Sequence, residues 1–255
     1  MLTIDLNCDM GESTALWEYD LQKDISLLPY ISSINLACGF HAGDAYTMHE
    51  LTHAALQAGV AVGAHPGFPD REDFGRMNMQ LSEQEIYDIV LYQIGALSAF
   101  LNVSGTTLHH VKPHGALYNM AAKEESIAAA ICKAVADFDK RILLYGLSGS
   151  KLIEQAIVAG LKTCSEVFAD RTYQDDGSLT SRMEPNALIE DTEIAMQQVV
   201  NMVQHNSVTS VNGKPVFIAA ETICIHGDGK HAFEFAKAIN VALKQSGIII
   251  KSSEG

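Results

Sequence analysis

Ionisable and amide side chains gather where the apolar, strand-like runs of this sequence end. Six of the seven runs are followed by such groups, and residues two apart in a run, such as Asp5, Asn7 and Asp9, share one face of a strand. Such groups at the ends of several strands are typical of an active site. The groups are Asp5, Asn7, Asp9 and Glu12; Asn35, His41 and Asp44; His65; Lys112, His114 and Tyr118; Glu166 and Asp170; and His226 and Asp228.

The arginines suggest recognition of an anion. The chain has only five, and four lie in two long connections, residues 66–80 (Arg71, Arg76) and 169–185 (Arg171, Arg182). Both connections follow strand-like runs and are long enough to close over a site. Guanidinium groups bind carboxylate or phosphate through forked hydrogen bonds. The alternative is a set of surface ion pairs with the neighbouring acidic residues.

The segment HELTH (residues 49–53) has the H-E-x-x-H pattern that places two zinc-binding histidines on one helical face. The periodicity of residues 44–58 predicts a helix whose apolar stripe packs on the sheet. At about 100° per residue, His49 and His53 lie roughly 140° to 180° from the middle of that stripe. The glycine and third histidine of the extended peptidase motif are also absent. We therefore interpret HELTH as a chance match on a solvent-facing surface.

No standard nucleotide-binding motif is present. GLSGSK (146–151) lacks the G-x-x-x-x-G-K-[ST] spacing of a phosphate loop, and no G-x-G-x-x-G follows the first strand-like run. The sequence therefore does not indicate where a nucleotide would bind.

Alternating strands and helices must position the polar groups. Ser82 with Glu85 forms a capping box, and Asp44 is better explained as a helix N-cap than as a site residue. The strand-like runs are residues 2–8, 31–38, 59–65, 107–113, 141–146, 162–169 and 215–225, and helical periodicity covers about 44–58, 82–102, 124–137, 149–160, 190–205 and 229–246.

Strand and helix taking turns, without a linker or a repeat, predicts a single parallel α/β domain over residues 1–255. Seven strands allow an open doubly wound sheet or a closed barrel. An open sheet usually binds ligands at one switch point, whereas ionisable groups follow six of these strands. We therefore expect a seven-stranded (β/α) barrel of the TIM type, with the site at the carboxyl ends of its strands.

Composition excludes several classes of function. The net charge of −14 opposes binding to nucleic acid or to an anionic membrane surface. The chain begins without a basic segment, and no apolar run is long enough to span a membrane, so we expect a cytoplasmic protein. Five cysteines without C-x-x-C spacing indicate reduced thiols rather than a disulfide framework.

Six segments together resemble the LamB/YcsF family along nearly the whole chain. They are DLNCDMGE, NLACGFHAGD, GAHPGFPDREDFGR, HVKPHGALYN, EVFADRTYQDDGSL and CIHGD. Two positions depart from the expected pattern, because Cys8 stands where alanine is expected and Gly67 where serine is usual. Neither change removes an ionisable group.

The resemblance implies a seven-stranded barrel related to the glycoside hydrolase and polysaccharide deacetylase folds. It implies an ATP-dependent 5-oxoprolinase activity, in which 5-oxo-L-proline, a lactam, is opened with water to L-glutamate while ATP is hydrolysed. It also implies 5-oxoprolinase subunits B and C as partners, and ATP could be bound mainly by those partners.

Roles for individual residues follow from this chemistry. Asp9 or Glu12 would be the general base on water, and Lys112 and His114 would stabilise developing negative charge. His226 and Asp228 would transfer a proton to the ring nitrogen. The residues expected to bind substrate are Asn7, Asn35, His41, His65, Arg71, Tyr118, Glu166, Asp170, Arg171 and Arg182, with the arginines on the substrate carboxylate.

The relationship to the deacetylases suggests a bound divalent metal, with Asp9, His41 and His65 as ligands. Zn or Mn would suit these ligands. Two rival functions stay open. One is a metal-dependent deacetylase or amidohydrolase that acts alone on a sugar or amide. The other is a non-catalytic scaffold of the oxoprolinase complex.

Overall fold

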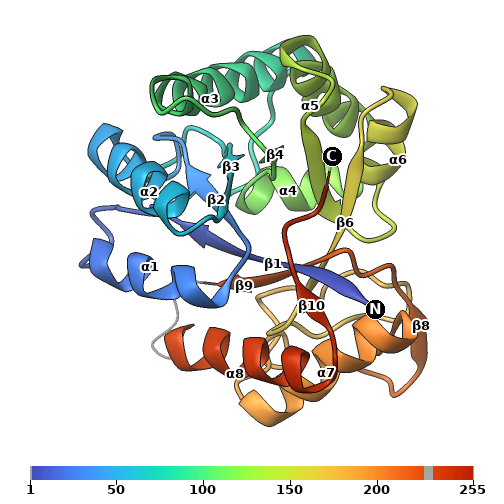
Figure 1. The fold of residues 1–255 in the computed structure, drawn as a ribbon. Helices are drawn as coiled ribbons and strands as arrows, with labels where there is room; N and C mark the ends of the chain where they lie inside the picture. The colour runs from blue at the N-terminus through green and yellow to red at the C-terminus, as the bar shows by residue number, and fades with distance from the viewer. Residues whose placement is uncertain (1, 227–231, 255) are drawn as a thin grey trace.

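The protein, seen in a computed structural model, is described for residues 2–226 and 232–254. Seven parallel strands form a closed barrel, because β1 pairs with β2 along one edge and with β9 along the other (Figure 1). This confirms the predicted seven-stranded barrel. In order around the barrel the strands are β1 (Thr3–Met10), β2 (Ser33–Ala37), β3 (Ala61–His65), β4 (His110–Val111), β5 (Leu143–Leu147), β6 (Thr163–Phe168) and β9 (Thr222–His226).

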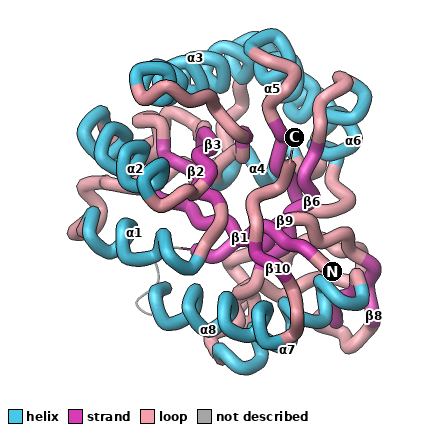
Figure 2. The backbone as a smooth tube through the Cα atoms, viewed as in Figure 1, coloured by secondary structure: helices cyan, strands magenta, loops and turns pink. Residues whose placement is uncertain are grey.

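Helices surround the strands on the outside (Figure 2). Each barrel strand is followed along the chain by a helix, and a short 3-10 turn, Leu28–Tyr30, precedes β2. The helices are α1 (Leu21–Leu27), α2 (Ala45–Gln57), α3 (Glu83–Val103), α4 (Gly115–Ala121), α5 (Glu125–Phe138), α6 (Lys151–Val158), α7 (Thr192–His205) and α8 (Ala232–Gln245). Helices α2, α3 and α6 contact the strands that precede them, β2, β3 and β5.

The side chains of strand β1 line two regions, the apolar core between barrel and helices and the polar inside of the barrel. Ile4, Leu6 and Cys8 belong to the apolar core between barrel and helices. The alternating residues face the inside of the barrel, where the Asp5 carboxylate accepts a hydrogen bond from Tyr145 of β5, across the barrel, at 2.9 Å. Because side chains alternate along a strand, one eight-residue run supplies both the apolar outer face and the polar inner face.

The predicted helix starts are confirmed. Asp44 and Thr47 form a capping box at the start of α2, and Ser82 and Glu85 form one at the start of α3. His49 and His53 of the HELTH segment are exposed on α2, as its apolar stripe predicts. Within the described chain, α3 alone is long and apolar enough to pass a test for a membrane span, yet seven of its residues are buried against the barrel layer.

Three parts of the fold differ from the sequence-based expectation. The run 215–225 divides into β8 (Pro215–Phe217), which pairs antiparallel with β7 (Ser207–Thr209), and the barrel strand β9. No residue of β8 is buried, which suits a surface hairpin, whereas residues 222–225 of β9 are all buried. Helices α1 and α4 were not predicted, because each has only seven residues. A short strand β10 (Ile249–Ile250) pairs with the first residues of β1.

Candidate active site

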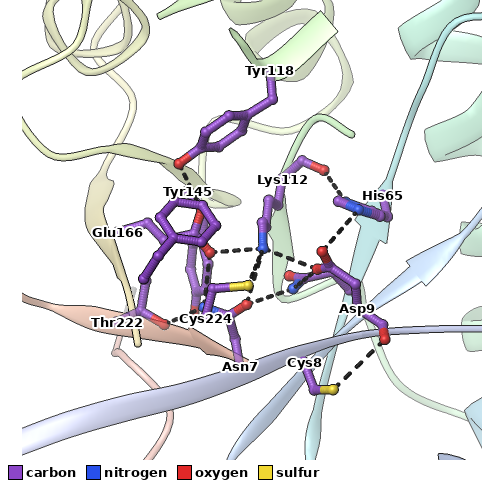
Figure 3. A network of polar contacts seen from close by, with 12 residues as sticks. Asn7, Cys8, Asp9, His65, Lys112, Tyr118, Tyr145, Glu166, Thr222 and Cys224 are labelled. Carbon is purple, nitrogen blue, oxygen red and sulfur yellow. Dashed lines mark hydrogen bonds and ion pairs between the residues drawn. The ribbon is translucent and has the colours of Figure 1, made fainter. Parts of the chain in front are cut away.

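A buried lysine lies at the centre of the barrel, close to the carboxyl ends of the strands (Figure 3). The Lys112 ammonium lies 2.9 Å from Asp9 Oδ1, at the end of β1, and 2.7 Å from Glu166 Oε1 on β6. Burial would lower the pKa of Lys112, but the Asp9 and Glu166 carboxylates raise it well above its usual range. The ammonium therefore stays charged and holds both carboxylates.

The residues around this ammonium satisfy one another. The Asn7 amide donates to Glu166 Oε1 at 3.0 Å, and Tyr118 donates to Glu166 Oε2 at 2.7 Å. The Asn35 amide donates to Asp9 Oδ1 at 2.7 Å and to Asn7 Oδ1 at 2.6 Å. We call the set Asn7, Asp9, Asn35, Lys112, Tyr118 and Glu166 the lysine group. It joins four predicted binding residues to two predicted catalytic ones.

A second cluster, the histidine group, consists of Glu12, His41, His65 and His114. Their ligating atoms all lie within 4.8 Å of one another, and all four residues are buried. Glu12 Oε1 is 3.5 Å from His41 Nε2, 3.9 Å from His65 Nε2 and 3.3 Å from His114 Nδ1. The rings of His41 and His114 stack with their centres 3.7 Å apart. The arrangement brings one carboxylate and three imidazoles to a single point.

Backbone carbonyls fix the orientation of two of these rings. His65 Nδ1 donates to the carbonyl of Lys112 at 2.7 Å, and His114 Nε2 donates to the carbonyl of Phe74 at 2.8 Å. A carbonyl can only accept, so the proton of each neutral ring is on the nitrogen that faces outward. The inward nitrogens, 3.0 Å apart, then both present lone pairs. Two facing lone pairs are favourable only with a cation or a proton between them.

The protonation states in the histidine group suit a metal ion. Burial lowers the pKa of His41 to about 3 and also lowers the pKa of His114, so both rings are neutral. Burial would raise the pKa of Glu12, but contacts with His114 and His41 lower it well below its usual range. Neutral imidazole and ionised carboxylate are the forms that bind metals.

Two further observations support the fit of a cation. Glu12 Oε1 and both ring nitrogens of His41 are buried without a hydrogen-bond partner among the described residues. Three imidazoles and one carboxylate form a donor set typical of divalent transition metals. The group could therefore hold a divalent metal ion. It contains His41 and His65 of the predicted ligands, with Glu12 and His114 in addition.

Asp9 connects the two groups. Its Oδ1 is held by Lys112 and Asn35, and its Oδ2 lies 3.5 Å from His65 Nε2 (Figure 3). The side chain is 9% exposed, so it borders the site without being sealed inside. Among the predicted ligands, Asp9 thus lies beside the histidine group rather than within it.

Two of the arginines predicted to bind substrate donate hydrogen bonds to backbone carbonyls instead. Arg71 donates to the carbonyls of Gly39 and Gly43, both at 2.9 Å, and to that of Ser13 at 3.2 Å. Arg171 is buried and donates to the carbonyls of Thr180 and Ala187. These guanidinium groups hold loops together, so the geometry does not favour them as the fork for a substrate carboxylate. Arg182 lies exposed on the 169–185 loop.

Of the remaining predicted residues, one lies in a loop and two have side chains outside the part of the chain that the structure describes. Asp170 is half-buried at the start of the 169–185 loop, where its carbonyl accepts from Ile189. The side chain of His226 and the whole of Asp228 lie outside the described residues. Their predicted part in proton transfer stays a prediction.

Sequence reasoning missed two residues that position the site. His110 donates to Asn35 Oδ1 at 2.7 Å beneath the lysine group. Its spacing of two from Lys112 places both on one face of the chain, and that parity could have revealed it. Phe74 lies against His41 and His114 with ring centres 5.5 and 4.8 Å away. Its contacts depend on how a loop folds, so no sequence signal could have indicated them.

A cavity of about 410 Å³ connects this region with solvent. Asp9 and Glu12 form part of its wall, and Trp17 and Phe233 line it on other sides. Lys23 is the one cationic side chain among its described lining residues. The cavity gives a small molecule access to the two carboxylates where the lysine and histidine groups meet.

The sequence is similar to proteins of one named kind. The chain is 56% identical over 252 residues to the A subunit of 5-oxoprolinase from Tolumonas auensis, covering 99% of this chain and 100% of the relative. It is 54% identical to the A subunit of 5-oxoprolinase from Geobacillus thermodenitrificans, covering 99% of this chain and 97% of that one.

Solved structures agree with the fold. A lactam utilization protein from Thermus thermophilus superposes with a TM-score of 0.92 at 44% identity, covering 99% of this chain and 100% of that one. A family 4 carbohydrate esterase from Streptomyces lividans, at 14% identity and a TM-score of 0.50, covers 97% and 91% and shares the fold alone. The profile of the LamB/YcsF family matches residues 4–255. The resemblance of the six segments is thus confirmed, and this chain belongs to the LamB/YcsF family.

Proposed function

We propose that this chain is the lactam-opening subunit of an ATP-dependent 5-oxoprolinase, which hydrolyses 5-oxo-L-proline to L-glutamate. The observation that carries the proposal is the meeting of Asp9 with the histidine group at the wall of a cavity, in a chain whose relatives are named as the A subunit of 5-oxoprolinase. A carboxylate held beside such a cluster suits the delivery of water to an amide carbon.

Asp9 is the general base in this proposal. Lys112 and Asn35 bind Oδ1 and leave Oδ2 directed toward the histidine group. The Lys112 ammonium, 2.9 Å from Oδ1, holds the carboxylate in one orientation. Glu12, the other candidate, is surrounded by three imidazoles, with its Oε1 3.3 to 3.9 Å from a nitrogen of each. Glu12 therefore serves as a ligand.

The histidine group would hold a divalent ion, with Zn or Mn favoured by its donor set. Such an ion, when bound, supplies Lewis acidity toward a carbonyl or water oxygen.

ATP is needed to activate the substrate because a lactam is a poor electrophile. Transfer of the γ-phosphoryl group to the amide oxygen, with release of ADP, activates the ring carbon toward water. Attack by water and cleavage of the C–N bond, with a proton delivered to the ring nitrogen, then open the ring to an acyl phosphate. A second water hydrolyses the acyl phosphate to L-glutamate and phosphate. The sequence has no phosphate loop, so we propose that ATP is bound mainly by partner subunits B and C. Lys23 is a candidate to meet the substrate carboxylate in the cavity.

Glutamate release from 5-oxoproline tests the proposal. We expect release when the purified chain is combined with its partner subunits and ATP, and none from the chain alone. Glutamate formed by the isolated chain without ATP would overturn the coupled mechanism. ATP-independent hydrolysis of an acetylated sugar or a simple amide, abolished by a chelator, would instead establish the stand-alone deacetylase or amidohydrolase.

The scaffold alternative has its own test. If the chain only supports its partners, Asp9→Asn leaves the rate of the reconstituted complex unchanged. A large loss of rate in a variant that still assembles eliminates the scaffold.

A further inference from the structure

Phe74 has a backbone conformation that is unusual for its residue type. Its φ of 55° lies in the left-handed region, where only one other non-glycine residue of the described chain, Asn206, is found. Asn206 follows the end of α7, where asparagine commonly adopts this conformation. A phenylalanine there is strained, because its Cβ crowds the backbone. Such strain persists only where the surroundings enforce it, and it often marks a functional site.

The loop around Phe74 is held from several sides. Gly75, also at positive φ, donates to the carbonyl of Asp70 at 2.7 Å and accepts from the amide of Ala116 at 2.9 Å. A Cβ atom added to Gly75 would lie 2.8 Å from the Cβ of His41. The loop is therefore seated between α4 and the histidine group, and the strained residue occupies the centre of that contact.

The strain has a visible result at the carbonyl of Phe74. That oxygen accepts the hydrogen bond from His114 Nε2 at 2.8 Å. The acceptor places the proton of the ring on Nε2, so Nδ1 faces Glu12 and His65 as a lone pair. With the proton on Nδ1 instead, His114 could not serve as a ligand at this point.

The ring of Phe74 packs against two imidazoles of the histidine group. It is 2% exposed and meets the rings of His41 and His114 at interplanar angles of 81° each. On another side it contacts Trp17, whose ring centre is 4.7 Å away and which lines the cavity. Phe74 thus lies between the stacked imidazoles and Trp17, a residue of the cavity wall.

We propose that Phe74 is a positioning residue, whose strained backbone carbonyl sets the tautomer of His114 and so prepares the histidine group for a cation. The tautomer of His114 is independent of the proposed reaction, whereas the binding of a cation rests on the proposed function.

Two substitutions distinguish the effect of the Phe74 backbone carbonyl from the effect of its ring. Phe74→Gly removes the ring but keeps the left-handed backbone without strain. Phe74→Val also removes the ring, but its branched Cβ disfavours positive φ and moves the carbonyl. Circular dichroism and thermal unfolding check that both variants fold. The substitution Tyr46→Val, on the exposed surface of α2, is the control for a general effect of valine.

The tautomer is read from side-chain ¹⁵N shifts of metal-free protein at pH 8, with His114→Gln to assign the signals. We expect the Nε2–H form in the parent chain, in Phe74→Gly and in Tyr46→Val, and its loss in Phe74→Val. An Nδ1–H form in the parent chain overturns the proposal. Retention of the Nε2–H form in Phe74→Val, or its loss in Phe74→Gly, does so as well.

Zn²⁺ affinity gives the second readout, measured by chelator competition. Displacing a residue that orients a ligand typically weakens metal binding by about 10- to 100-fold, and we expect that loss in Phe74→Val. The Zn²⁺ affinity of Phe74→Gly should be closer to that of the parent chain. If the parent chain binds no Zn²⁺, the proposed cation site fails, while the ¹⁵N shifts still decide whether Phe74 sets the tautomer.

Discussion

The lysine group, which includes Asp9, and the neighbouring histidine group lie at the same barrel mouth, yet they differ in how their polar atoms are satisfied. In the lysine group, each carboxylate and amide has a partner supplied by another barrel strand or by α4. In the histidine group, Glu12 Oε1 and both nitrogens of His41 have no hydrogen-bond partner among the described residues. The first group is complete within the protein, and the second is arranged for something that the protein binds.

This difference predicts opposite responses to substitution. Removing a member of a completed network leaves its partners buried and unpaired, which destabilises the fold. Removing a member of a cluster built for a ligand costs binding rather than folding.

Lys112→Met should lower the free energy of unfolding by about 3–5 kcal/mol, because it leaves the Asp9 and Glu166 carboxylates buried without their cation. Urea unfolding followed by circular dichroism measures the loss. Lys133→Met is the matched control, since Lys133 forms its ion pair with Asp137 on the exposed surface of α5 and should matter much less. Equal losses in the two variants would contradict the assignment of the lysine group.

Asp9→Asn should lower the rate of glutamate release in the reconstituted complex by about a hundredfold to a thousandfold, because asparagine cannot accept a proton from water. Its amide can still occupy the space beside Lys112 and Asn35, so the variant should assemble with its partners. Co-purification with the partner subunits checks assembly. A variant with the parent rate would remove Asp9 from the proposed mechanism.

Glu12→Gln should abolish stabilisation by Zn²⁺ and leave the metal-free chain folded. A ligand present at a hundred times its dissociation constant raises the free energy of unfolding by about 2.7 kcal/mol, and we expect that gain for the parent chain only. Urea unfolding with Zn²⁺ and with a chelator gives the two values. If the variant gains as much as the parent, Glu12 is no ligand.

His53→Ala should have the smallest effect. His53 is exposed on α2, and its ring shares a hydrogen bond of 2.8 Å with Gln57 one turn along the same helix. Stability should change by no more than about 0.5 kcal/mol, as for ordinary surface substitutions. Elemental analysis should show unchanged metal content. Loss of metal would reopen the zinc-peptidase interpretation of HELTH.

Much of this architecture follows from local patterns in the sequence. The parity of Asp5, Asn7 and Asp9 predicts a polar inner face of β1, and all three are buried there. The capping residues Asp44 and Ser82 predict where α2 and α3 begin, because caps satisfy backbone groups within a few residues. Patterns of this kind depend on near neighbours, so the sequence alone can reveal them.

Other features depend on contacts between distant segments. Arg71 has the residue type of an anion binder, but the carbonyls of Ser13, Gly39 and Gly43 surround it and accept its hydrogen bonds. The run 215–225 has enough apolar residues for one strand, but pairing with β7 withdraws its first part from the barrel. Neither outcome can be read from the residues themselves.

Local sequence patterns specify the alternation of strands and helices and the polar inner face of the barrel. Hydrophobic periodicity and strand parity are local properties, and they fix which residues face inward. Only the tertiary structure decided that Glu12 and His114 join His41 and His65, and that Asp9 stands beside them. Those relations depend on distances of a few ångströms between separate strands and loops, and barrel closure together with loop packing sets them.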